Sequence, residues 1–189
     1  MSRSARRVSI PVRTGCILGC VVGFVLLFAS CQHILDEASH AARIHTCRSN
    51  IKQLSQNINL YAQDWDDRLP MASALSDAIW NFEDHLLSFR CPDYPVNAPG
   101  LGYAYNSNLS LRRRATVADP GTTPLLYDSD ILQSNAHAPG RTGLADPPRH
   151  NVPREDVMLG FHLMNAIGFL DGHTASLDTQ AGVEAKKRE

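Results

Sequence analysis

Histidine, cysteine and acidic side chains are the residues of this chain that could bind a metal ion or move protons. Four of the eight histidines lie in the second half: His137, His150, His162 and His173. Zinc sites are commonly encoded by a CxxC pair or by HExxH, because these spacings place two ligands on one side of a turn or helix. The sequence contains neither motif. We therefore predict no metal site and no cofactor.

Two groups of acidic residues could hold an ion or act as a pair of acids. Asp64, Asp66 and Asp67 resemble part of a calcium-binding loop, but no glycine or later glutamate follows at the required spacing. We interpret them as solvated residues at a helix end. Asp128 and Asp130 are interpreted as a strand end and a turn.

Other signs of catalysis or of charged partners are weak. The chain has no GxSxG motif and no phosphate-binding glycine loop. The run Arg112-Arg113-Arg114 lacks interleaved aromatic residues, so we interpret it as a solvated loop rather than as a surface for an acidic partner. With a formal net charge of -1 we expect no nucleic-acid partner. We predict that the protein is not an enzyme; the alternative, an anchored enzyme, would need acidic and histidine side chains in one deep pocket.

The cysteines suggest two kinds of modification. Cys47 and Cys91 are the only cysteines after the apolar N-terminal segment and its edge. An even count in an oxidising compartment predicts a disulfide between them, and two buried free thiols are the alternative. Cys31 follows Leu27-Phe28-Ala29-Ser30, which resembles a lipobox with phenylalanine where leucine is usual. If Cys31 is acylated, residues 1–30 are removed and the chain is a lipoprotein.

The N-terminus has the layout of a membrane anchor. The first 35 residues carry four arginines and no acid, and the remainder carries 14 basic and 19 acidic residues. The run from Thr14 to Ser30 has 17 residues without a charge, and a spanning helix needs roughly 17 to 25 residues. Because arginines stay on the cytoplasmic side, we expect a single-pass protein of the inner membrane. The predicted parts are a basic cytoplasmic N-terminus (1–13), a transmembrane segment (14–31), an exported domain (32–183) and a charged tail (184–189).

A long stretch free of helix breakers predicts one helix that continues past the apolar run. No proline occurs between Pro11 and Pro70, and the helix should end near residues 67 to 70. Two faces of this helix are expected to pack. Glycines spaced by four allow another helix to approach closely: Gly15, Gly19 and Gly23. An apolar stripe at helical spacing should cover the helix's own domain, with a coiled coil as the alternative: Ile44, Cys47, Ile51, Leu54, Ile58, Tyr61 and Trp65.

The remainder predicts a short helix and several strands. Residues 71–90 have helical spacing of apolar residues. Strand-like segments are residues 102–109, 123–128, 166–170 and 173–177. Asp171-Gly172 between the last two predicts a two-residue hairpin turn in which both residues have positive φ. Residues 133–157, rich in proline, predict a long irregular loop.

An ordered set of short motifs runs through the exported part. It comprises CRSNIKQLSQNINLYAQDWDDRLP (47–70), FRCP (89–92), YAYN (103–106), TPLLYD (123–128), RHN (149–151) and FLDGH (169–173). This set resembles prepilin-like proteins of bacteria, including type II secretion pseudopilins. The family usually has a leader glycine followed, five residues on, by glutamate; here Gly15 is followed by Cys20. Its late pattern is often a histidine, nine residues and Asp-Gly, and His162 precedes Asp171 by one residue too few.

The resemblance implies an α+β, pilin-like fold. A long N-terminal helix lies half in the membrane and packs its outer half on a small antiparallel sheet. The implied function is non-enzymatic, through self-assembly or contacts with other envelope or pilin-like proteins. The alternative is a lipoprotein anchored through Cys31 that serves as an envelope binding module.

Overall fold

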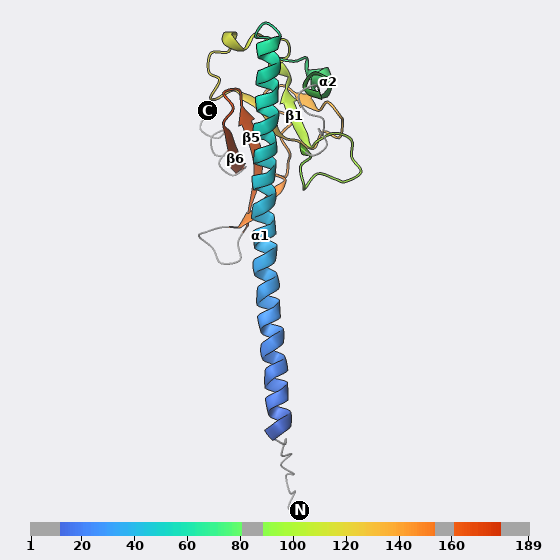
Figure 1. The fold of residues 1–189 in the computed structure, drawn as a ribbon, viewed down its shortest axis with the longest axis vertical. Coiled ribbons are helices and arrows are strands. Elements are labelled where there is room, and N and C mark those ends of the chain that lie inside the picture. Colours follow the sequence, from blue (N-terminus) through green and yellow to red (C-terminus); the bar gives the residue numbers. More distant parts are fainter. Residues whose placement is uncertain (1–11, 81–88, 154–160, 179–189) are drawn as a thin grey trace, which may run out of the picture. The chain divides into compact units, whose positions relative to one another are not determined.

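The computed structural model describes residues 12–80, 89–153 and 161–178 (Figure 1). Contacts within the chain divide it into two units, Met1–Ser39 and His40–Glu189. Helix α1, Val12–Asp64, begins in the first unit and ends in the second, and the other described elements belong to the second unit. The architecture is α+β. The predicted charged tail, 184–189, lies outside the described residues.

The part of α1 in the first unit is apolar and exposed. Large apolar side chains on it are more than half exposed, including those of Phe24, Leu26 and Leu27, and the rings of Phe24 and Phe28 stack at 6.4 Å. Among the described residues, one helix is long and apolar enough to cross a membrane, and it is this one. Length and composition therefore agree with the predicted N-terminal anchor.

The C-terminal end of α1 lies at Asp64, a few residues before the predicted end. Asp66 and Asp67 have positive φ, 57° and 59°, a conformation that aspartate tolerates better than most residues. The Asp67 N–H donates a hydrogen bond to the Ala62 carbonyl at 2.8 Å. This bond satisfies a carbonyl group that the last turn leaves unpaired. The helix therefore stops through left-handed aspartates before Pro70 can act on it.

Two of the three consecutive arginines lie beside this helix end. Arg113 pairs with Asp66, and Arg114 Nε lies 3.1 Å from Asp67 Oδ1. The Ala115 N–H donates to Asp67 Oδ2 at 2.8 Å. The interpretation of these acids and arginines as merely solvated was incomplete, because they neutralise one another. The pairing offsets the unfavourable position of aspartates at the negative end of a helix.

The segment after Pro70 is only partly helical as described. It forms a 3-10 turn η1, Ala72–Ala74, and the helix α2, Leu75–Trp80. Residues 81–88, which complete the predicted helix, lie outside the described residues.

The second unit contains one sheet, which lies against the part of α1 after residue 40 (Figure 1). Its strands are β1 (Tyr103–Asn106), β2 (Pro124–Asp128), β3 (His137–Ala138), β4 (His150–Pro153), β5 (Phe161–Phe169) and β6 (Thr174–Asp178). The order is β3-β1-β2-β5-β4, and β6 also pairs with β5. The predicted strand over 102–109 is shorter, because the 3-10 turn η3, Ser107–Leu109, follows β1.

Two expectations about the sheet were wrong. The sheet is mixed rather than antiparallel, because β3 pairs with β1 in parallel, with Tyr105 opposite His137. Residues 133–157 are not a continuous irregular loop, because they contain β3 and β4. These strands are short and begin or end near prolines, so alternation of apolar and polar residues does not mark them.

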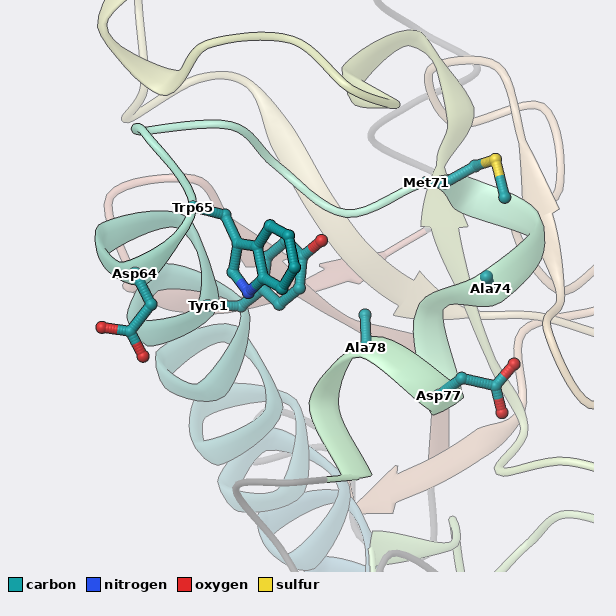
Figure 2. A pocket seen from close by; sticks show the side chains of 7 residues that line it. All are labelled: Tyr61, Asp64, Trp65, Met71, Ala74, Asp77 and Ala78. Atoms are coloured by element: carbon teal, nitrogen blue, oxygen red, sulfur yellow. The ribbon is translucent and has the colours of Figure 1, made fainter.

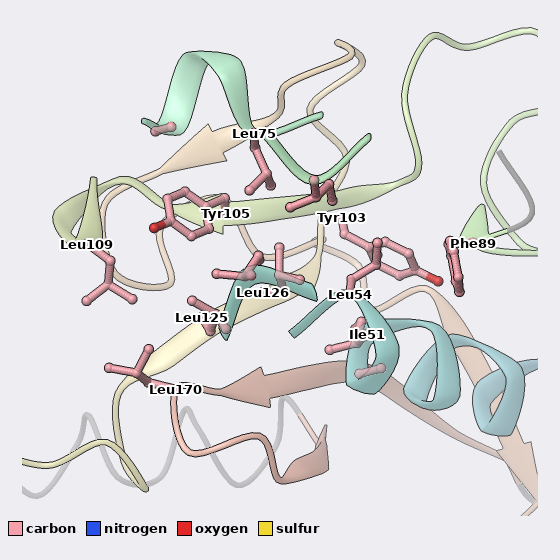
Figure 3. Close-up of a cluster of buried hydrophobic side chains, with 14 of the residues drawn as sticks. Ile51, Leu54, Leu75, Phe89, Tyr103, Tyr105, Leu109, Leu125, Leu126 and Leu170 are labelled. Carbon is pink, nitrogen blue, oxygen red and sulfur yellow. The ribbon is translucent and has the colours of Figure 1, made fainter. Parts of the chain in front are cut away.

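The predicted apolar stripe of α1 forms one wall of the core (Figure 3). Ile44, Cys47, Ile51, Leu54 and Ile58 are all buried. The opposite wall is formed by side chains from the sheet and its connections: Tyr103, Tyr105, Leu125, Leu126, Ala166 and Leu170. The stripe ends with half-buried Tyr61 and exposed Trp65. From Ile44 to Ile58 the stripe packs on the chain's own domain.

One glycine sets how closely α1 lies on the sheet. A Cβ atom at Gly168 of β5 would lie 2.5 Å from Ile51 Cγ2 and 3.1 Å from Ser55 Oγ. Both neighbours belong to α1, so the helix passes directly over this strand position. Any larger residue at 168 would push the helix away.

The hairpin between β5 and β6 has a longer turn than the sequence predicted. The Phe169 N–H donates to His173 O, and the Gly172 N–H donates to Phe169 O, both at 2.9 Å. Three residues therefore lie between the paired Phe169 and His173. Gly172 has a φ of 92°, whereas Asp171 is not among the residues with positive φ. The arrangement is a turn that finishes with a left-handed glycine.

The close contact predicts a strong effect of Gly168→Ala. Overpacking of a core costs about 1–3 kcal/mol, and we expect a loss of this size in the free energy of unfolding. Ile51→Ala alone should cost about 2–5 kcal/mol through its cavity. The double variant should be less destabilised than the sum, because alanine at 51 has no Cγ2. Denaturant unfolding in detergent measures all three, and strictly additive losses would contradict the contact.

Candidate functional site

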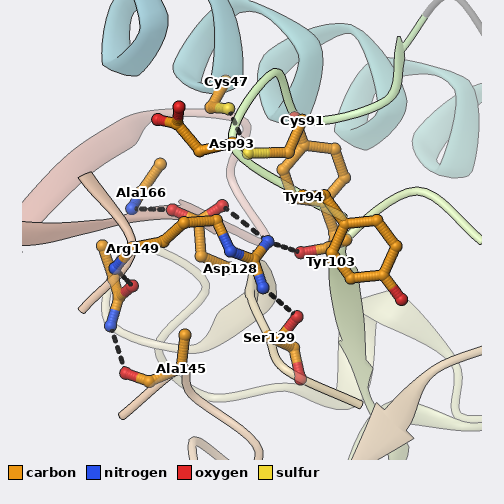
Figure 4. A network of polar contacts seen from close by, with 12 residues as sticks. Cys47, Cys91, Asp93, Tyr94, Tyr103, Asp128, Ser129, Ala145, Arg149 and Ala166 are labelled. Carbon is orange, nitrogen blue, oxygen red and sulfur yellow. Dashed lines mark hydrogen bonds and ion pairs between the residues drawn. The ribbon is translucent and has the colours of Figure 1, made fainter. Parts of the chain in front are cut away.

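Four polar side chains with metal-binding or proton-binding atoms meet at one end of the core. They are Cys47 of α1, Cys91 of the loop after Phe89, Asp128 at the end of β2 and His150 at the start of β4. All four are buried, and one ligand atom from each lies within 4.8 Å of all the others. Figure 4 shows Cys47, Cys91 and Asp128 converging from these elements. We call this group the Cys-Asp-His cluster.

Local structure places each member of the Cys-Asp-His cluster. Cys47 lies one turn before Ile51 on the buried face of α1. The Cys91 N–H donates to the Leu101 carbonyl at 2.9 Å, and the Tyr94 N–H donates to the Cys91 carbonyl at 3.0 Å. The second bond closes a tight turn over Pro92 and Asp93. In the sheet, Asp128 of β2 lies opposite Tyr103 of β1.

His150 lies between two carboxylates. Its Nδ1 is 2.7 Å from Asp93 Oδ2 and its Nε2 is 3.1 Å from Asp128 Oδ2. Burial disfavours the charged imidazole, but the hydrogen bond to Asp128 and the contact with Cys91 outweigh it and raise the pKa of His150 to about 10. In the absence of any other cation, the ring is therefore a buried imidazolium that offsets the charge of Asp128.

Asp93 connects the Cys-Asp-His cluster to the surface of α1. Its Oδ1 accepts a hydrogen bond from Arg43 at 2.7 Å. Burial alone would raise the pKa of Asp93, but the hydrogen bonds from Arg43 and His150 lower it overall. Asp93 is thus a carboxylate that orients the His150 ring and is itself held by a guanidinium group.

Asp128 is the most deeply buried acid among the described residues of the network. Its Oδ2 accepts a hydrogen bond from the Ala166 N–H as well as facing His150. Its Oδ1 lies 3.9 Å from Arg149 NH1 and has no hydrogen-bond partner among the described residues. A buried carboxylate oxygen without a partner is costly. The Cys-Asp-His cluster therefore contains one oxygen that can still accept a proton, water or cation.

The two thiols lie side by side without a bond between them. Cys47 Sγ is 2.7 Å from Cys91 Sγ, and both cysteines are free. The contact with Cys47 and the neighbouring His150, 3.8 Å away, outweigh burial and lower the pKa of Cys91 to about 6. The same contact, together with burial, raises the pKa of Cys47. The two sulfur atoms are closer than two unbonded thiols normally lie, and the disulfide stays a prediction.

Arg149 fixes the chain around the Cys-Asp-His cluster. Its guanidinium donates to the carbonyls of Gly102 and Ser129 and to Asp130 Oδ1, the first at 2.6 Å and the last at 2.8 Å (Figure 4). Its Cζ also lies 5.1 Å from the centre of the Tyr94 ring. Only 5% of its side chain is exposed. Arg149 therefore ties the ends of β1 and β2 to the segment that begins β4.

The structure places the acidic residues and histidines singled out from the sequence in different surroundings. Asp128 and Asp130 both lie near Arg149 and do not form an acid pair of their own. His173 contacts Asp171 at 2.6 Å and stacks on Phe169, and His137 Nδ1 lies 2.7 Å from the Asn135 carbonyl. The side chain of His162 lies outside the described residues. Of the three histidines whose side chains the structure describes, His150 alone belongs to the Cys-Asp-His cluster.

Sequence reasoning missed the Cys-Asp-His cluster and named two of its members for another reason. Cys47 and Cys91 were paired as a disulfide, whereas Asp128 and His150 were given no joint role. The four residues come from four separate elements, so no local spacing encodes them. The one usable signal was that Cys91-Pro92-Asp93 and Arg149-His150 each place two chemically active residues close together.

Apart from the Cys-Asp-His cluster, the surface has a hollow where α1 ends, beside α2 (Figure 2). The rings of Tyr61 and Trp65 stack there at 5.5 Å, and Trp65 is 60% exposed. Asp64, Asp77 and Met71 also line this hollow, so that two acidic groups adjoin it. The hollow is open and mostly apolar.

No family model, no curated protein and no solved structure matches this chain. The interpretation of the Cys-Asp-His cluster and of the hollow therefore rests on the residues of this chain.

The hydrogen bonds of Arg149 predict that lysine cannot replace it. Lysine keeps the charge but loses the planar fork, and a hydrogen bond to a charged group contributes about 1.5–3 kcal/mol. We expect Arg149→Lys to lower the free energy of unfolding by about 2–4 kcal/mol. The matched control is Arg141→Lys at an exposed position, which should change stability by less than about 0.5 kcal/mol. Equal effects in urea unfolding would contradict the role of Arg149.

Proposed function

We propose that this chain is a single-pass, pilin-like protein of the bacterial envelope that acts through assembly or protein contacts rather than catalysis. The N-terminus would lie in the cytoplasm and the second unit outside the inner membrane. One observation carries this proposal: burial along α1 changes from exposed apolar side chains to a one-sided buried stripe.

The two parts of α1 have different chemical requirements. Val21, Phe24 and Leu27 are each more than half exposed in the first unit, and so large an apolar surface is unfavourable in water. From Ile44 onward the helix buries a stripe against the sheet of its own domain. A helix that is lipid-facing in one part and domain-facing in the other meets both requirements. This is the arrangement that the resemblance to prepilin-like proteins implies.

The glycine face of α1 is the surface that we assign to contacts with another helix. Apart from the helix's own backbone, no described atom lies within 4 Å of a Cβ atom placed at Gly19 or Gly23. Gly15 lies one turn before Gly19, so all three lie on one face. In lipid, small residues let helices approach closely. The position that carries glutamate in the family is Cys20 here, so assembly in this chain would depend on close packing rather than on a buried acid.

The anchor predicts how the protein behaves in membranes and where its mature chain begins. We expect it to stay in the pellet after carbonate washing and to dissolve in detergent. Mass spectrometry should find a mature N-terminus at Met1, or at Cys16 if a leader is removed after Gly15. A lipid-modified Cys31 would instead support the lipoprotein alternative and contradict the spanning helix.

The glycine face predicts self-association that depends on small residues. Gly19→Leu and Gly23→Leu should reduce cross-linking between copies in membranes, because leucine separates the helices. Val21→Leu is the control for the opposite side of the helix, where it adds a single methylene group. Equal cross-linking in all three variants would show that this face carries no contact.

A further inference from the structure

We propose that Cys47, Cys91, Asp128 and His150 bind one divalent transition-metal ion, of which zinc fits the ligands best. The inference assigns the exported domain a ligand and is independent of the membrane and assembly roles. Two thiolates, one imidazole and one carboxylate are a set of ligands that zinc accepts in tetrahedral sites.

The four ligand atoms are close enough together to surround one ion, although two of the three separations below are shorter than in a bound tetrahedral site. Bonds of about 2.0–2.3 Å place neighbouring ligand atoms about 3.3–3.8 Å apart. Cys91 Sγ lies 3.8 Å from His150 Nε2, and His150 Nε2 lies 3.1 Å from Asp128 Oδ2. The two sulfur atoms, at 2.7 Å, must separate by about 1 Å to share a metal. Rotation of one cysteine side chain can supply that movement.

The surroundings of the ligands favour a metal as well. His150 directs Nε2 into the Cys-Asp-His cluster while its Nδ1 lies 2.7 Å from Asp93 Oδ2. A carboxylate behind a histidine ligand fixes the ring and increases its basicity in known metal sites. Arg43 in turn holds Asp93 at 2.7 Å. The second layer of contacts that a metal site requires is therefore already in place.

Charge and burial lead to the same conclusion. The Asp128 carboxylate is buried and its Oδ1 lacks a hydrogen-bond partner among the described residues; a cation held through Oδ2 would offset the charge of the whole carboxylate. With a metal bound, the two thiolates and the carboxylates of Asp93 and Asp128 would face the divalent ion, Arg43 and Arg149. Arg149 also pairs with Asp130, so the divalent ion supplies most of the positive charge that the thiolates and Asp128 need. All four ligands are buried, so the site is closed, as in structural rather than catalytic zinc sites.

The competing state is a disulfide between the same two sulfur atoms. A disulfide would consume both thiolates and leave His150 as the counter-ion of Asp128. It requires the sulfurs to approach to about 2.05 Å, whereas the metal requires them to separate. The two states exclude each other, so one experiment distinguishes them.

The test uses the full chain in detergent, with Cys16, Cys20 and Cys31 replaced by serine so that only Cys47 and Cys91 can supply thiolates. After reduction and chelation, Co²⁺ is added. We expect one Co²⁺ per chain, with tetrahedral ligand-field bands and thiolate-to-cobalt charge transfer, and displacement by Zn²⁺. Reduced protein that gives no such bands would overturn the proposal.

Variants and native material complete the test. Asp93→Asn should weaken Zn²⁺ binding by about 10–100-fold, because it alters the histidine's orienting partner. Cys91→Ser should weaken the charge-transfer band because it removes one of the two thiolates, and replacing both cysteines should abolish the band. His137→Gln is the matched control, since His137 bonds only the Asn135 carbonyl among the contacts described; its affinity should not change. Protein isolated from membranes without reductant should contain zinc and two alkylatable thiols at 47 and 91. A Cys47–Cys91 disulfide without metal in that material would refute the proposal.

Discussion

The contact between Ile51 of α1 and Gly168 of β5 determines much of the second unit. It lets the helix lie closer to the sheet than any side chain at 168 would allow. Because Cys47 lies one turn before Ile51 on the same face, the same closeness carries its thiol to Cys91. A side chain at 168 would therefore disturb the packing of Ile51 and, one turn away on the same face, the position of Cys47.

The buried charges impose a second constraint. Asp128 and His150 are fully buried, and neither charge would be tolerated there alone. Each is held by groups from elsewhere in the chain: Asp93 and Arg43 behind His150, Arg149 and the Ala166 N–H around Asp128. These contacts join α1, the loop after Cys91, β2, β4 and β5. The polar network thus fixes segments that contribute few apolar side chains to the core.

Periodic parts of this fold could be predicted from the sequence, and non-local parts could not. The stripe from Ile44 to Ile58 follows the helical repeat, and β2 and β6 follow short apolar runs near turn residues. By contrast, β3 is two residues long and pairs in parallel with β1, so nothing near it in the sequence indicates its partner. The pairing of Asp66 and Asp67 with arginines also depends on a contact between distant segments.

The Cys-Asp-His cluster could not be predicted from the sequence for the same reason. Metal motifs are recognisable when a turn or a helix supplies two ligands at fixed spacing. Here each ligand comes from a different element, and only the fold brings them within reach of one another. Sequence reasoning therefore paired Cys47 with Cys91 but did not find their neighbours Asp128 and His150.

Cys47, the member of the Cys-Asp-His cluster on α1, lies two turns after the point in the sequence where the second unit begins. Arg43, Ile44 and Cys47 lie in the first turns of α1 that belong to the second unit. The ion pair of Arg43 with Asp93 and the approach of Cys47 to Cys91 attach these turns to the loop after Phe89. A metal ion or a disulfide at Cys47 and Cys91 would strengthen this attachment beyond what the exposed ion pair supplies.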